Sequence, residues 1–133
     1  MNLTEIISAK VIAMLFSLVM TWSTTPDSGT KYYGECSVTA YSGTPGITYG
    51  ASGNTLIPWQ SVAAPRATLP LGTVLFIEDV GFVVVEDRLS EWYEIENDNM
   101  VIDIFVNDYD EACAWGRKSK QVYIVCLPDE EKE

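Results

Sequence analysis

The chain has 133 residues and is 47% hydrophobic, which suits one ordinary domain with a hydrophobic core. It carries 19 acidic against 8 basic residues, and twelve of the acidic residues fall between Glu78 and Glu111, where Arg88 is the only basic one. Such a field repels a phosphate backbone, which argues against nucleic-acid binding. The chain has no histidine, so neither a histidine-activated nucleophile nor a histidine-ligated zinc site can be built. Proton transfer must use another group, and a buried carboxylate is the best candidate.

The N-terminal segment is an almost unbroken apolar run from Val11 to Trp22, preceded by Lys10. Its length suits the hydrophobic region of a signal peptide better than a full membrane span. We predict a helix over Ile6–Trp22 and assign residues 1–23 to export or anchoring, with membrane contact through this segment. The alternative is an apolar helix that docks on the domain or on a neighbouring subunit. Residues 24–35, rich in turn-forming residues, are predicted to be a linker.

The remainder, 36–128, reads as a barrel domain built from short strands. Alternation and β-branched residues predict six strands, over Cys36–Ser42, Val62–Ala64, Thr73–Glu78, Phe82–Glu86, Met100–Val106 and Lys120–Leu127. A tight turn at Asp79–Gly81 joins the third strand to the fourth, and the glycine-rich Gly43–Asn54 is a long loop. Many short strands favour a closed β-barrel over a layered parallel sheet. An acidic tail, 129–133, follows.

One helix is predicted inside this domain, near Asp108–Arg117. Asp108 precedes Glu111 by three residues, which is a capping-box pattern, and Gly116 ends the helix. Ala112 and Trp115 are expected on its inner face.

The three cysteines, Cys36, Cys113 and Cys126, lack the spacing of a metal site. If the protein is exported, Cys36 and Cys126 are the pair expected to form a disulfide, because they begin the first predicted strand and end the last. Cys113 is expected at a core-facing position of the helix. The alternative is three reduced, buried thiols.

Several short motifs follow one another in an order that resembles the three-aspartate (3D) domain of bacterial cell-wall lytic enzymes. The resemblance covers about Ser37 to Val125, and the motifs are Thr39–Tyr41, Ala51–Gly53, Leu69–Thr73, Val85–Asp87, Ile102–Phe105 and Trp115–Arg117. It implies a mainly β fold, a six-stranded double-psi β-barrel with one short helix, beside the separate N-terminal apolar helix. It also implies a peptidoglycan lytic transglycosylase-like enzyme that acts on glycan strands without a cofactor or metal, in the bacterial envelope, outside the cell or on a phage.

Two departures from the family pattern bear on activity. Ala64 precedes Pro65 where the family has its first aspartate, and Asp87 opens a run of bulky residues to Trp92 where the family has a glycine-rich loop. The alternative function is therefore a non-catalytic double-psi barrel, serving as a glycan-binding or structural module.

The candidate catalytic residues are Asp103 and Asp87, because each lies in an otherwise apolar strand where a carboxylate is either costly or useful. Asp103 is expected to be the acid, with apolar neighbours that raise its pKa. Asp87 is either the acid or a charged neighbour, and pairing with Arg88 would favour a structural role. The structural alternative for both is that they accept backbone hydrogen bonds at a barrel end. The candidate substrate-binding residues are Tyr41, Ser52, Gly53 and Trp92.

Overall fold

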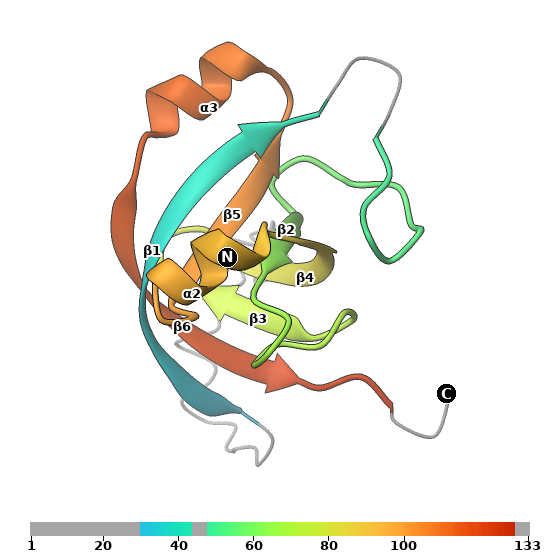
Figure 1. The fold of residues 1–133 in the computed structure, drawn as a ribbon, viewed down its shortest axis with the longest axis vertical. Coiled ribbons are helices and arrows are strands. Elements are labelled where there is room, and N and C mark those ends of the chain that lie inside the picture. Colours follow the sequence, from blue (N-terminus) through green and yellow to red (C-terminus); the bar gives the residue numbers. More distant parts are fainter. Residues whose placement is uncertain (1–29, 44–47, 130–133) are drawn as a thin grey trace, which may run out of the picture.

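The computed structural model describes residues 30–43 and 48–129, which form a β-barrel with two short helices on its outside (Figure 1). The strands are β1 (Lys31–Ser42), β2 (Ser61–Ala64), β3 (Val74–Ile77), β4 (Gly81–Arg88), β5 (Val101–Val106) and β6 (Lys118–Cys126), and the helices are α2 (Glu91–Glu96) and α3 (Tyr109–Trp115). The helix predicted over Ile6–Trp22 lies outside the described residues. Within the described ranges, no helix is long and apolar enough to cross a membrane.

The six strands close into a barrel in the order β1-β5-β2-β4-β3-β6. Strands β1 and β5 are parallel, as are β2 and β4, whereas the other neighbouring pairs are antiparallel. The predicted closed barrel of six strands is confirmed, and it is consistent with a double-psi barrel. Each predicted strand is present, although β1 begins at Lys31, five residues before the predicted start.

Alternate side chains of each strand fill the barrel interior. The core consists of fully or nearly fully buried apolar residues from all six strands and one loop: Cys36, Val38, Val62, Ala64, Leu69, Leu75, Ile77, Val83, Val85, Ile102, Ile104, Val106 and Val122. A second, smaller cluster forms on the outer face, where Ala63, Leu89 and Val101 are buried against Tyr41 and Tyr93. We call this second group the outer cluster.

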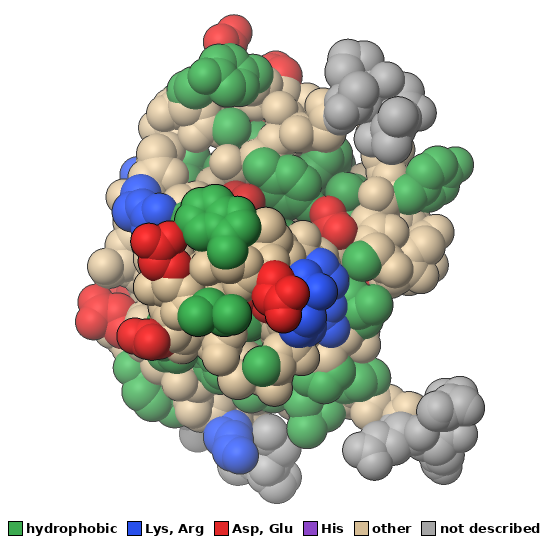
Figure 2. Space-filling model, in the orientation of Figure 1, with side chains coloured by type: hydrophobic (Ala, Val, Ile, Leu, Met, Phe, Trp, Pro, Cys, Tyr) green, Lys and Arg blue, Asp and Glu red, His purple; other side chains and the backbone are tan. Residues whose placement is uncertain are grey.

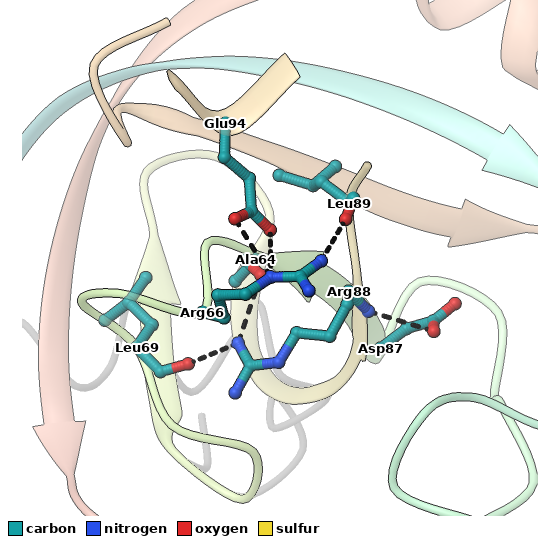
Figure 3. Close-up of polar contacts among 7 residues, drawn as sticks. All are labelled: Ala64, Arg66, Leu69, Asp87, Arg88, Leu89 and Glu94. Atoms are coloured by element: carbon teal, nitrogen blue, oxygen red, sulfur yellow. Dashed lines mark hydrogen bonds and ion pairs between the residues drawn. The ribbon is translucent and has the colours of Figure 1, made fainter. Parts of the chain in front are cut away.

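Helix α2 was not predicted, and the expectation of a single helix in the domain is wrong. The helix is anchored by Glu94, which is 3% exposed and accepts from Arg66 Nε at 3.1 Å (Figure 3). Arg66 Nη2 also donates to the carbonyl of Leu89, 2.7 Å away, just before the helix. Arg66, 28 residues from Glu94 in the sequence, thus holds this short helix in place, and no local sequence pattern predicts the helix.

Helix α3 begins and ends as predicted. The side chain of Asp108 accepts from Glu111 N at 2.9 Å, and Gly116 is the C-cap with φ of 72°. Ala112 and Trp115 pack against the core, as expected. Cys113 is exposed, so its predicted core-facing position is wrong. On a helix it lies about 100° from Ala112 and still further from Trp115, which places it away from the barrel.

The predicted Cys36–Cys126 disulfide is also wrong, because all three cysteines are free. Strand β6 runs antiparallel to β1, so Cys36 lies opposite Lys120. Cys126 is six residues further along β6, roughly 20 Å away at the spacing of an extended strand. Cys36 is buried and Cys126 exposed, which also contradicts the alternative of three buried thiols.

Candidate functional site

The two aspartates lie in one row across four neighbouring strands. Asp87 of β4 is opposite Ala63 of β2, Ala63 is opposite Asp103 of β5, and Asp103 is opposite Thr39 of β1. At about 4.8 Å per strand, the backbones of Asp87 and Asp103 are therefore separated by roughly 10 Å. Only the methyl group of Ala63 stands between them in the row.

A β-bulge is what places Asp87 on this outer face. Val83 and Val85 point into the core, so strict alternation would send the side chain of Asp87 inward as well. The register shifts between Val62, which pairs with Val85, and Ala63, which pairs with Asp87. The extra residue, Glu86, restores the outward direction for Asp87.

Asp103 has a side-chain hydrogen bond with Thr39 and a largely apolar setting. Thr39 Oγ1 donates to Asp103 Oδ1 at 2.9 Å. The pKa of Asp103 is raised to about 6, chiefly by burial. The hydrogen bond from Thr39 and the charge of Arg117 lower this pKa, whereas the charge of Asp87 raises it. The carboxyl group is therefore divided between its neutral and charged forms at mildly acidic pH.

The apolar environment of Asp103 differs in part from the predicted one. Ile102 and Ile104, its sequence neighbours, point into the core. Val101, two residues away in the sequence, does share its outer face, as predicted, and Ala63 of β2 lies there too, in the outer cluster with which Tyr41 and Tyr93 pack. Tertiary structure, rather than local sequence, supplies the contribution of Ala63 and the two tyrosines.

Asp87 is held by three hydrogen-bond donors from three parts of the chain. Its Oδ2 accepts from the hydroxyl of Tyr41 at 2.7 Å, and its Oδ1 accepts from the backbone N–H groups of Ala51 and Arg88, each at 2.9 Å. The alternative that the Arg88 side chain pairs with Asp87 is not what the structure has, because the guanidinium group donates to the carbonyls of Ala64 at 3.1 Å and Leu69 at 2.7 Å (Figure 3). Asp87 thus differs from Asp103 in being fixed by several donors.

Tyr41 connects the first strand of this row to the last. It projects from β1 on the same face as Thr39, packs edge-on against Phe105 with ring centroids 5.5 Å apart, and reaches Asp87 on β4. Burial raises the pKa of Tyr41, as do its hydrogen bond to Asp87 and the charges of Asp87 and Asp103. Its hydroxyl group therefore keeps its proton and donates it in the hydrogen bond to Asp87.

The loop that carries Ser52 and Gly53 lies against the bulge. Ser52 donates twice to Glu86, from its backbone N–H to the carbonyl at 3.0 Å and from its hydroxyl to the carboxylate at 2.7 Å. A Cβ added to Gly50 would lie 2.3 Å from the carbonyl oxygen of Glu86, so the close approach requires glycine here. Gly53 has a φ of 91° and open space around it. The structure thus brings this loop beside Asp87.

Trp92 is on α2 and is 64% exposed, with its ring edge-on to Tyr93 at 5.6 Å. It is Tyr93 that packs on the outer cluster and accepts from Arg117 Nη2 at 2.7 Å. The sequence singled out neither Thr39 nor Arg117 as a site residue. The two-residue period of β1 could have paired Thr39 with Tyr41, but no sequence signal brings Arg117 to Tyr93.

No group of three or more His, Cys, Asp or Glu side chains in the described part of the chain is placed to hold a metal ion. The row itself carries two carboxyl groups, Asp87 and Asp103, which are able to take part in acid–base chemistry.

Comparisons with known proteins give likeness in fold only. No family model matches this chain, and no curated protein matches it in sequence. Among solved structures, a crystal structure of MltA from E. coli is 22% identical, with a TM-score of 0.49, and the match covers 60% of this chain and 28% of that one. A second MltA structure, described as a unique lytic transglycosylase fold, is 21% identical with a TM-score of 0.47 and covers 61% and 28%. The chain therefore spans under a third of the length of these proteins.

Proposed function

We propose that this protein cleaves the glycan strands of peptidoglycan as a lytic transglycosylase-like enzyme, with Asp103 as its single general acid and base. The observation that carries the proposal is the contrast between two carboxyl groups in one row. Asp103 is desolvated, with its pKa raised to about 6, whereas Asp87 is fixed by three donors. Groups whose environments differ in this way are suited to different roles in acid–base catalysis. The order of the sequence motifs supplies the substrate class.

In the proposed reaction, neutral Asp103 donates its proton to the oxygen that links N-acetylmuramic acid to N-acetylglucosamine. The bond from that oxygen to the muramyl C1 breaks, and the muramyl 6-hydroxyl oxygen attacks C1. The charged Asp103 then takes the proton of that hydroxyl group, which closes a 1,6-anhydro ring and restores the acid. No water is consumed, so one carboxyl group serves both steps, unlike the two of ordinary glycosidases.

Asp87 acts in this scheme as the charged neighbour. Its negative charge raises the pKa of Asp103, which keeps more of the acid protonated. A negative charge on the same face also stabilises the positive charge that develops at C1 in an oxocarbenium-like transition state. Tyr41 and Ala51 N hold Asp87 in place for both effects.

A second candidate is a glycan-binding module without catalysis. Two observations favour it. Ala64, at the position of the family's first aspartate, is fully buried with its carbonyl engaged by Arg88, and Trp92 offers an exposed aromatic face of the kind that stacks on sugars.

The test is digestion of purified peptidoglycan by the full chain, with analysis of the released fragments. We expect 1,6-anhydro ends from the wild type and a loss of about 10²–10⁴-fold in rate for Asp103→Asn, which keeps the size of the side chain but cannot donate the proton. Asp87→Asn should lose less. Reducing ends would indicate hydrolysis instead, and binding to wall sacculi without cleavage would favour the binding module. Full activity in Asp103→Asn would refute the assignment of the acid.

A further inference from the structure

Arg117 is a cation beside the acid that no carboxylate neutralises in the described structure. Its Nη2 donates to the hydroxyl of Tyr93 at 2.7 Å, and its Nη1 donates to the hydroxyl of Ser37. The ion pairs between described residues, Arg66–Glu94 and Lys120–Asp79, do not include it. A guanidinium group has five N–H donors, so its contacts with two neutral hydroxyls orient it and leave its charge and further donors free.

The position of Arg117 is fixed relative to Asp103 by the strand register. Ser37 pairs with Val101, and two residues along the same face Thr39 pairs with Asp103. The guanidinium group is thus held about one two-residue step, roughly 7 Å, from the row of the acid. Its charge reaches Asp103, where it lowers the pKa of the carboxyl group.

A general acid needs a raised pKa, so the lowering of the Asp103 pKa by Arg117 does not help the proposed acid. The position of Arg117 beside Asp103 therefore needs another explanation. Arg117 also belongs to a strongly acidic chain, whose net charge is −11. Figure 2 shows the face that carries α2 and α3, on which acidic side chains are spread and Lys and Arg side chains are few. An anionic substrate would be repelled by this face except where an exposed guanidinium group receives it.

We propose that Arg117 is the binding site for a carboxylate of the glycan substrate, next to the scissile bond. The inference rests on the proposed function. Peptidoglycan carries such carboxylates on its stem peptides and, where the peptide is removed, on the lactyl group of muramic acid. Arginine presents two parallel N–H donors that match a carboxylate. Binding neutralises the charge that acts on Asp103, so the pKa of the acid rises when the substrate is in place.

The experiment measures binding by calorimetry to full-length Asp103→Asn, which cannot turn the ligand over. Three soluble ligands are compared: a disaccharide that carries a stem peptide, the same fragment with its carboxylates converted to amides, and the peptide-free disaccharide with its lactyl carboxylate. We expect the amidated fragment to bind about tenfold or more weakly than the charged one. Adding Arg117→Gln should remove most of that difference.

Two further variants keep the result interpretable. Lys118→Gln removes the same charge from the next residue, whose Nζ lies over the ring of Trp115 at 4.7 Å, and should keep the preference for carboxylate. Arg117→Lys keeps the charge without the paired donors and should lose part of the preference. Strong, Arg117-dependent binding of the peptide-free disaccharide identifies the lactyl carboxylate, and its absence identifies the stem peptide.

Equal binding of the charged and amidated fragments, or a preference that survives Arg117→Gln, would overturn the carboxylate site and leave the proposed cleavage standing if the wild type still releases anhydro ends. If no fragment binds and the wild type cuts no glycan, the proposed function fails and the site at Arg117 fails with it.

Discussion

Replacing the proposed acid should stabilise the protein at neutral pH. Asp103 has a pKa raised from 3.8 to about 6 in the folded protein, chiefly by burial. Between these values the folded state binds more protons than the unfolded state, so the free energy of unfolding falls as the pH rises. The stability that the raised pKa of Asp103 contributes is fully present below pH 3.8 and is lost as the pH passes about 6. The whole difference corresponds to about 3 kcal/mol, since one pKa unit is worth about 1.4 kcal/mol.

Asp103→Asn removes this titration while it keeps an oxygen for the Thr39 hydroxyl. Urea unfolding of both proteins between pH 5 and pH 7.5 isolates the effect, because the other acids contribute equally to the two. Over that range the stability of the variant relative to the wild type should rise by about 1.4 kcal/mol, roughly half of the full effect.

Asp98→Asn is the matched control, because it removes one carboxylate from an exposed turn where φ is 53° and asparagine is tolerated. Its relative stability should change much less with pH. A constant or falling difference between Asp103→Asn and the wild type would refute the reasoning that burial penalises the charged acid.

Two further predictions concern the groups around Asp87. Tyr41→Phe removes one of the three donors to the Asp87 carboxylate, so we expect a loss of about 1–3 kcal/mol in stability and a reduced rate of glycan cleavage. Both quantities are measured beside those of Asp87→Asn. An unchanged rate in both variants would contradict the role given to Asp87. Gly50→Ala places a Cβ 2.3 Å from the Glu86 carbonyl oxygen and should push the loop away from Asp87. We expect it to lower the melting temperature more than Ser52→Ala does. Equal melting temperatures of the two variants would show that the loop moves without strain.

The sequence by itself determined most of the barrel. Short runs rich in β-branched and apolar residues between turn residues located every strand in the described part of the chain, and the pair Asp108 and Glu111 located the start of α3. These signals act between residues close in sequence. It also singled out Asp87 and Asp103 as carboxylates in apolar strands.

Tertiary structure decided what surrounds those carboxylates. Strict alternation places Asp87 in the core, and only the bulge at Glu86 turns it outward into the row of Asp103. The anchor of α2, Arg66 with Glu94, joins residues 28 apart, and Arg117 meets Tyr93 across 24 residues. Contacts between distant segments depend on the closed barrel that brings strands together out of sequence order, so no local pattern encodes them. The same closure sets Cys36 opposite Lys120 and keeps it from Cys126, because register, rather than position at a predicted strand end, decides which side chains meet.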